Sequence, residues 1–165
     1  MLHQSRDRCN GRGEWQIHVN PTVSLDIAAS SGGGNVKLNL ADMAVTHLSA
    51  DTGGGNIDVV LPDNAADLSV AVSTGGGNVA VDLGSGTTGS NTVNAKSGAG
   101  NVVVRIPGGI AARVHATSGL GKVTMDPWLN KVDKNTYQSP DYDSATNKVE
   151  IAISSGAGNV SVNTK

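Results

Sequence analysis

The sequence contains a short glycine motif that occurs six times. Each copy consists of Ser or Thr, Gly, any residue, Gly, Asn or Lys, and then Val or Ile; the copies begin at Ser31, Thr52, Thr74, Ser97, Ser118 and Ser155. Their first glycines are separated by 21, 22, 23, 21 and 37 residues. Self-similarity at a period of about 20 to 50 residues is typical of stacked supersecondary units. The motif therefore predicts a repeat array whose last interval carries an insertion of 37 − 21 = 16 residues.

The segments around each motif alternate between apolar and polar side chains. After the first copy, Val36, Leu38 and Leu40 alternate with Lys37 and Asn39. A period of two indicates a β-strand with one buried face and one solvent-exposed face. Each unit is therefore predicted to be a strand, a glycine corner, a second strand and a return loop. The expected fold is all-β, a β-solenoid-like stack of about six units of roughly 21 residues each.

The glycines and the residue after them have separate expected roles. A tight corner needs positive φ or close backbone approach, and a Cβ obstructs both. The middle position is Ala99, Leu120 or Ala157 in three copies, which predicts an ordinary backbone conformation there. The glycine after it is present in every copy, as Gly34, Gly55, Gly77, Gly100, Gly121 and Gly158. Asn follows in five copies, as Asn35, Asn56, Asn78, Asn101 and Asn159, and stacking at roughly 4.8 Å predicts a ladder of amide side chains.

The chain length favours one domain with a flexible beginning. A chain of 165 residues fits a single domain. The polar residues 1–13 are expected to be a flexible segment, and residues 14–165 a single β-repeat domain. Within it, the alternating residues 14–19 are predicted to form a first strand that caps the array. The insertion is expected at about residues 126–147, with at most a short turn near 126–131 and no helix elsewhere.

Composition limits the partners and the compartment. The net charge is −2 and no run is basic, which argues against nucleic-acid binding. Cys9 is the only cysteine, so no internal disulfide can form. No apolar run approaches the roughly 18 residues of a membrane helix, and the N-terminus lacks the apolar core of a signal peptide. We expect either a cytosolic protein or a fragment without its export or anchoring part.

The common catalytic and ligand-binding patterns are missing from the sequence. A strand follows each glycine corner, whereas a phosphate loop is followed by a helix. Calcium-binding β-rolls repeat every nine residues with Asp after the glycines, unlike this array. The histidines have no metal-ligand spacing, the carboxylates are not paired for acid–base catalysis, and no nucleophile elbow occurs. We expect no enzyme activity, no cofactor and no metal site.

Two candidate recognition surfaces remain. The insertion holds Trp128, Tyr137 and Tyr142 beside Asp141, and aromatic rings with nearby carboxylates suit sugar binding. The alternative is that these aromatics cover an end of the array. The Ser and Thr residues that begin the motifs form the second candidate, because an outward row of hydroxyls can order water or contact a polysaccharide. The alternative is an ordinary solvated face.

Several of these features together resemble a known family. They are Trp15, the stretch 38–43, the glycine corners, the endings Leu61-Pro62 and Ile106-Pro107, and the stretch 137–142 before the last strand. This combination, over roughly residues 14–163, resembles the toastrack domains of LiaF-like bacterial envelope-stress proteins and the related adhesin-like domains of unknown function. The resemblance implies a domain without known catalysis that follows membrane helices and takes part in sensing cell-wall damage. No catalytic residues are carried over, and this chain has no membrane helices.

Three functional hypotheses follow from the sequence. The first is a non-enzymatic envelope or surface domain, adhesin-like, that binds a protein partner or a cell-wall polymer. The second, implied by the resemblance, is a regulatory or sensing domain of a cell-wall stress response at the cell envelope. The third is a self-assembling structural protein, because open strand edges at the ends of the array favour homo-oligomers.

Overall fold

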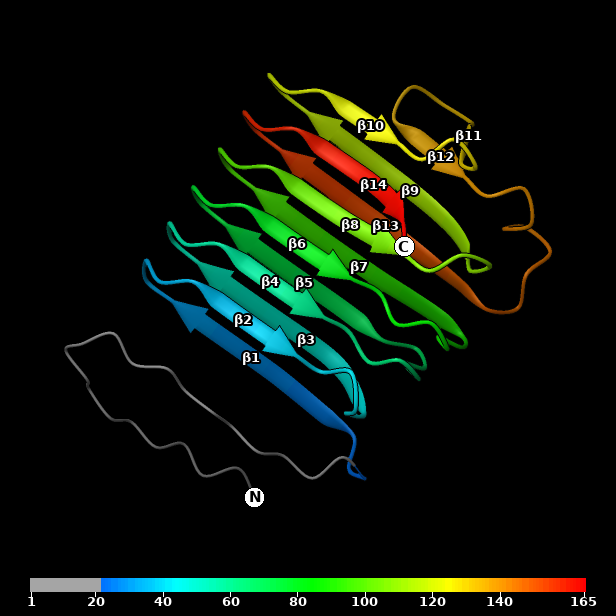
Figure 1. Ribbon diagram of the computed structural model, residues 1–165, viewed down its shortest axis with the longest axis horizontal. Coiled ribbons are helices and arrows are strands. Elements are labelled where there is room, and N and C mark those ends of the chain that lie inside the picture. The colour runs from blue at the N-terminus through cyan, green and yellow to red at the C-terminus, as the bar shows by residue number, and fades with distance from the viewer. Residues whose placement is uncertain (1–21) are drawn as a thin grey trace.

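The computed structural model describes residues 22–165, which form an all-β stack without a helix (Figure 1). The predictions for residues 1–13 and 14–19 lie outside these residues. The described strands are β1 (Leu25–Ser31), β2 (Val36–Asn39), β3 (Val45–Thr52), β4 (Ile57–Val60), β5 (Ser69–Thr74), β6 (Val79–Asp82), β7 (Ser90–Ser97), β8 (Val102–Ile106), β9 (Ala111–Ser118), β10 (Val123–Met125), β11 (Asn130–Lys131), β12 (Thr136–Gln138), β13 (Lys148–Ser155) and β14 (Val160–Thr164). The predicted β-solenoid-like toastrack stack is confirmed.

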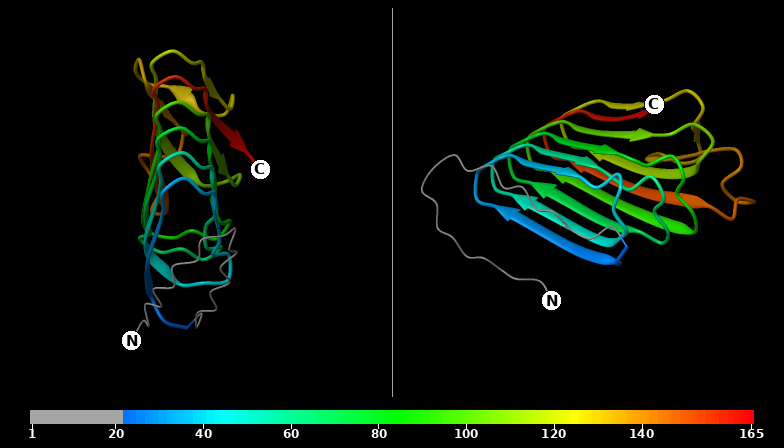
Figure 2. Two further views of the ribbon diagram at one scale, coloured as in Figure 1. Left: turned by 90° about the vertical axis from the view of Figure 1, so that its left-hand side faces the viewer. Right: turned by 60° about the horizontal axis from the view of Figure 1, so that its bottom comes forward.

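Each unit contributes one strand to each of two facing sheets. The eight-stranded sheet has the order β1-β3-β5-β7-β13-β9-β12-β11, and the six-stranded sheet has the order β10-β14-β8-β6-β4-β2. All pairs between repeat units are parallel, whereas β12 pairs antiparallel with β9 and with β11. Figure 2 shows the two layers edge-on, with the glycine corners aligned along one side. Parallel pairing follows because every unit runs through the same strand, corner and strand in the same direction.

The last unit of the sequence is not the last unit of the stack. β13 pairs with both β7 and β9, and β14 pairs with both β8 and β10. The C-terminal unit therefore lies between the fourth and fifth units of the sequence (Figure 1). The 37-residue interval contains the connection that makes this possible. The chain leaves the β9–β10 unit and returns to form β13 and β14 between that unit and the β7–β8 unit. The repeat pattern in the sequence does not indicate this order.

The core is a thin layer of aliphatic side chains between the sheets. Its centre contains fully buried side chains such as Val59, Val81, Val104 and Val162, each 0% exposed. Burying a side chain of this size stabilises a fold by about 1.5–3 kcal/mol, which explains how a chain without Phe holds a core. At the β1–β2 end, the inward-facing Ile27, Ala29, Val36 and Leu38 are only partly buried. One side of that end unit therefore lacks a covering layer among the described residues.

The corners require glycine because successive corners approach closely, and not because of positive φ. A Cβ on Gly77 would overlap the Gly55 carbonyl oxygen, and the same contact recurs from unit to unit. A Cβ at Gly76 would meet no heavy atom nearer than 4.0 Å. The expected tolerance of the middle position is therefore confirmed. Among the described glycines, positive φ occurs at Gly89 and Gly109, which are outside the motif.

The row of Ser and Thr hydroxyls lies inside the corners, so the predicted outward array is wrong. The Thr74 hydroxyl donates a hydrogen bond to the Gly55 carbonyl (2.8 Å) and accepts one from the Gly77 N–H (3.1 Å). The same pair of bonds is made by Thr52, Ser97, Ser118 and Ser155. Each hydroxyl thus joins its own corner to the neighbouring corner and is not available to order water.

The predicted asparagine ladder is present, with a different bonding partner. The Oδ1 atoms of Asn35, Asn56, Asn78, Asn101 and Asn159 each accept a hydrogen bond at 2.8–2.9 Å from the backbone N–H at the equivalent position of the next unit. Only the pair Asn78 and Asn56 adds a bond between the two side chains, at 3.3 Å. The last of these N–H groups belongs to Lys122, in the β9–β10 unit at the end of the stack.

Candidate functional site

The insertion is fixed to the outer edge of β9. β12 pairs with β9, and the chain then turns at Ser139, which is buried. The Ser139 N–H donates to the Ala112 carbonyl (2.8 Å), and the Ser139 hydroxyl accepts from the Ala112 N–H (3.0 Å). These two bonds hold the segment after β12 against the eight-stranded sheet.

Asp126 anchors the start of the insertion to the C-terminal strand. Its Oδ2 atom accepts hydrogen bonds from the Thr164 N–H (2.9 Å) and the Thr164 hydroxyl (2.8 Å). These bonds lower the pKa of the Asp126 carboxyl below its usual value, with the backbone N–H of Thr164 as the main cause. The carboxylate therefore fixes the end of β14 beside the turn that follows β10.

The two aromatics Trp128 and Tyr137 lie on the core side of the stack. Both are half-buried and pack against the hydrophobic core. The Trp128 Nε1 atom is buried and has no hydrogen-bond partner among residues 22–165. Tyr137 lies opposite Val114 of β9, and the Lys131 ammonium lies 6.0 Å from its ring centre. Both rings therefore cover the β9–β10 end of the array.

Tyr142 lies elsewhere, against the outward-facing side chains of β9 and β13. It is 6% exposed, and the Arg113 guanidinium and the Lys148 ammonium lie 4.4 and 5.0 Å from its ring centre. Burial raises the pKa of the Tyr142 hydroxyl above its usual value; the Glu150 carboxylate adds to the rise and Arg113 opposes it. The structure therefore does not bring the three predicted aromatics into one platform.

A polar network surrounds Tyr142. Arg113 Nε donates to Gln138 Oε1 (2.9 Å), its Nη2 lies 3.4 Å from Asp143 Oδ1, and Gln138 Nε2 donates to Asp143 Oδ2 (3.0 Å). We call Arg113, Gln138, Tyr142, Asp143 and Lys148 the insertion face. Asp141 is exposed next to it, and its carbonyl accepts the Ala145 N–H at 2.9 Å. Sequence reasoning missed Arg113 and Lys148, because nothing in the alternating strands distinguishes them from other outward charges.

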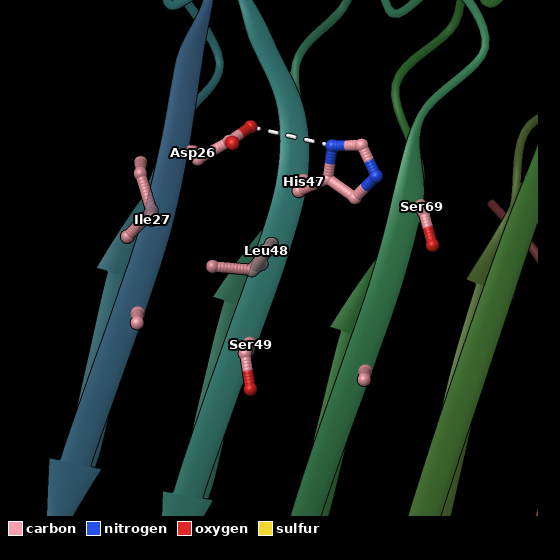
Figure 3. A pocket seen from close by; sticks show the side chains of 8 residues that line it. Asp26, Ile27, His47, Leu48, Ser49 and Ser69 are labelled. Atoms are coloured by element: carbon pink, nitrogen blue, oxygen red, sulfur yellow. Dashed lines mark ion pairs between the residues drawn. The ribbon is translucent and has the colours of Figure 1, made fainter.

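A shallow hollow lies on the outward side of β1, β3 and β5 (Figure 3). Its volume is about 310 Å³, and small side chains such as Ser49 and Ser69 form its floor. His47 Nδ1 lies 3.3 Å from Asp26 Oδ1, and the Thr46 hydroxyl donates to the same oxygen (3.0 Å). The His47 and Asp26 side chains are 68% and 77% exposed, so water screens their interaction.

Neither region contains a cluster of metal ligands. In the part of the chain from residue 22 onward, no three His, Cys, Asp or Glu side chains are grouped so that they could hold a metal ion. No helix in this part is long and apolar enough to cross a membrane. The insertion face instead offers fixed side chains of both charges on a rigid sheet.

Two family models match the chain. The C-terminal domain of LiaF, described as a cell wall-active antibiotics response protein, matches residues 65–162, which include the whole insertion. The chain belongs to the LiaF-like C-terminal family. The N-terminal domain of toast_rack matches residues 3–82, so the two matches together span most of this LiaF-like chain.

A solved structure has the same fold. It is described as a "putative cell adhesion protein" from Clostridium sporogenes, and it superposes with a TM-score of 0.68 at 17% sequence identity. The match covers 89% of the LiaF-like chain and 96% of the neighbour. Similarity at this level of identity shows a shared toastrack fold. A comparison with curated proteins found no significant match.

Proposed function

We propose that this LiaF-like chain is a non-enzymatic recognition domain of a cell-envelope stress response, and that it binds a protein partner through the insertion face. The observation that carries the proposal is the family match over residues 65–162, because it contains the entire segment that departs from the repeat. The repeat units supply a rigid support, and the insertion adds side chains that the repeat units lack.

The geometry of the insertion face favours a protein over a sugar as the partner. A sugar-binding ring needs an open face, whereas Tyr142 is almost fully buried and lies beside two cations. The hydrogen bonds from Arg113 to Gln138 and from Gln138 to Asp143 hold these groups in position before binding. Positioned charges of both signs give specificity and orientation to protein interfaces.

The test compares two Arg–Asp pairs on opposite sheets. A strain without this gene should respond abnormally to antibiotics that act on the cell wall, and the wild-type gene should restore the response. Arg113→Ala removes the pair with Asp143 and should fail to restore it, whereas Arg105→Ala removes the pair with Asp82 on the six-stranded sheet and should succeed. Both proteins must melt at similar temperatures. A deletion strain that responds normally would contradict the proposed role, and equal restoration by both variants would exclude the insertion face.

The second candidate function is adhesion, through a cell-wall polymer. The neighbour from Clostridium sporogenes favours it by its fold and its description. In this case Trp128 and Tyr137, which cover the β9–β10 end of the array, would contact the ligand. Titration of the purified chain with cell-wall glycans and with lipid vesicles, followed by tryptophan fluorescence, tests this candidate. Saturable binding that Trp128→Ala abolishes would support it, whereas no binding by a folded chain would reject it.

A further inference from the structure

The β9–β10 corner, at one end of the stack, leaves three backbone groups without a partner. In the other five corners, the carbonyl of the second invariant glycine accepts a hydrogen bond from the hydroxyl of the next corner toward this end. The carbonyl of the Ser or Thr accepts one from the next first glycine, and the N–H after the ladder position donates to the next ladder carbonyl. At the end corner these groups are the Gly121 carbonyl, the Ser118 carbonyl and the Val123 N–H, and none has a partner among residues 22–165.

The strand that follows this corner continues the unpaired row. β14 is the one described strand that pairs with β10, and it bonds to the Lys122 carbonyl and the Asp126 N–H. Because residues of a strand bond alternately to its two sides, the N–H and carbonyl groups of Val123 and Met125 point away from β14. The side chains of Val123 and Met125 are only partly buried, whereas the inward side chains of β14 are fully buried. The edge of β10 is therefore open to a further strand.

The eight-stranded sheet limits what can pair with this edge. β12 lies along residues 113–115 of β9 (Figure 1), and the Ala116 N–H donates to the Asn135 carbonyl. If a second copy continued the stack, its β1 would need the same edge of β9, so β12 excludes that arrangement. A single extended segment that enters at the corner and continues beside β10 avoids the overlap.

Lys122 indicates the charge of the segment that fits. In the other five corners the ladder residue is Asn, whose Oδ1 atom accepts the N–H of the next unit. The exposed Lys122 ammonium can only donate hydrogen bonds. A carboxylate at the same position of an added strand would lie about one strand spacing away, roughly 4.8 Å, and would complement this charge. Leu120 and Val132, which are 88% and 63% exposed at the same end, offer apolar contacts beside it.

We propose that the β10 edge binds an extended segment of a partner protein, which carries an acidic residue and becomes the seventh strand of this sheet, parallel to β10. A Ser or Thr at its start donates to the Gly121 carbonyl, and a glycine N–H donates to the Ser118 carbonyl. The carbonyl of the acidic residue accepts the Val123 N–H, and the apolar residues that follow cover Val123 and Met125. Backbone hydrogen bonds supply affinity in this mode of recognition, and alternate side chains supply specificity. The surface is separate from the insertion face, which lies on the outward side of the eight-stranded sheet.

The test is an exchange of charges between the full chain and a synthetic peptide. The peptide has the sequence of residues 155–163, which form the neighbouring corner and strand, and carries Asn159→Asp. Fluorescence anisotropy of the labelled peptide should show saturable binding, and Lys122→Glu should weaken it by about tenfold because an attraction becomes a repulsion of similar size. A second peptide with Asn159→Lys should show the reverse preference. Lys96→Glu, at an exposed position of β7, is the matched control and should leave both affinities unchanged.

Hydrogen exchange of the unsubstituted chain provides a second measurement that does not depend on any variant folding. The Val123 and Met125 amides should exchange rapidly in the free chain at low concentration, and the Asn159→Asp peptide should slow them by about tenfold or more. Protection of these amides in the free chain would overturn the proposal, because the edge would already be covered.

Three further outcomes would also overturn it. The first is no saturable binding of either peptide, and the second is the same loss of affinity in Lys122→Glu and Lys96→Glu. The third is protection of the Val123 amide that appears only as the chain concentration rises, together with a larger mass by light scattering. This last result would assign the edge to a second copy of the chain.

Discussion

At the corners inside the stack, three positions of the motif make contacts to the neighbouring unit. The Ser or Thr hydroxyl donates to the neighbouring carbonyl, the second invariant glycine allows that carbonyl to approach, and the asparagine Oδ1 accepts the N–H of the following unit. Because each contact joins equivalent positions, one substitution perturbs two units. The motif therefore reflects stacking more than the shape of a single turn.

The glycine requirement is tested by neighbouring substitutions in one corner. Gly77→Ala places a Cβ against the Gly55 carbonyl, and backbone atoms there cannot move without displacing a strand. We expect a loss of about 3 kcal/mol in the free energy of unfolding, at the upper end of typical overpacking costs. Gly76→Ala should change it by no more than about 0.5 kcal/mol. Urea denaturation measures both values, and equal losses would contradict the stacking explanation.

The ladder predicts a dependence on position in the stack. Asn78→Ala removes the acceptor of the Asn101 N–H, and the loss of one such hydrogen bond should cost about 0.5–1.5 kcal/mol. Lys122 occupies the same position in the β9–β10 unit, which is the last unit of the stack, so no further corner follows it. Lys122→Ala should therefore be nearly neutral in the same denaturation experiment. A similar loss for both variants would show that the ladder bond itself contributes little.

Tyr142 predicts a loss of stability in alkaline solution. Burial raises its pKa in the folded chain above its unfolded value of about 10. Folding therefore favours the neutral phenol. The contribution of neutral Tyr142 to the free energy of unfolding is fully present below the unfolded pKa, and it is lost as the pH rises through the folded pKa. Absorbance at the phenolate band should show a tyrosine that titrates above the unfolded value. In Tyr142→Phe this late titration should disappear, and if it remains the assignment is wrong.

The residue-scale predictions from sequence were right for the glycines and wrong for the hydroxyls. The occurrence of Ala99, Leu120 and Ala157 at the middle position showed correctly which site tolerates a side chain. The hydroxyl row was predicted on the outward face, although Thr52 shares the alternation of the buried Leu48 and Ala50. Extending that alternation by one step would have placed the hydroxyls inside the corner.

At the scale of the element, β13 has the most protected position in the stack. It pairs over its full length with β7 and β9, and Ile151 is 0% exposed. Ile151→Ala should cost about 2–5 kcal/mol because it leaves a cavity between two fixed layers. Ile27→Ala in the partly covered β1 should cost roughly half as much under the same conditions. Thermal unfolding compares the two variants, and equal costs would mean that β1 is as well packed as β13.

The order of the strands could not be predicted from the repeat. All six corners have the same hydroxyl, glycine and aliphatic pattern, so any unit can pair with any other. Two departures mark the end of the stack in retrospect: Lys122 replaces the ladder asparagine, and Leu120, which is 88% exposed, occupies the middle position. The candidate site was less predictable still, because Arg113 approaches Tyr142 only through the packing of the insertion on β9.

At the scale of the whole molecule, the part of the chain after Met125 is expected to contribute strongly to stability. Truncation after Met125 removes the insertion and the unit that separates β7–β8 from β9–β10. We expect a large fall in the urea midpoint and loss of amide protection in β9, since β9 loses its parallel partner β13 and its antiparallel partner β12. An unchanged midpoint would mean that β9 can pair directly with β7 and that the repeat units are interchangeable.

The position of the β13–β14 unit also affects how the protein is made. A ribosome releases the chain from its N-terminus, so the first four units can stack while synthesis continues. The β9–β10 unit emerges next, but its place is separated from β8 by a unit that has not yet been translated. Until the β13–β14 unit is translated, the nascent chain exposes the edges of β7 and β8, which can capture β9 and β10 in the wrong order. Correct assembly of the first five units therefore depends on a sixth unit that is made after all of them.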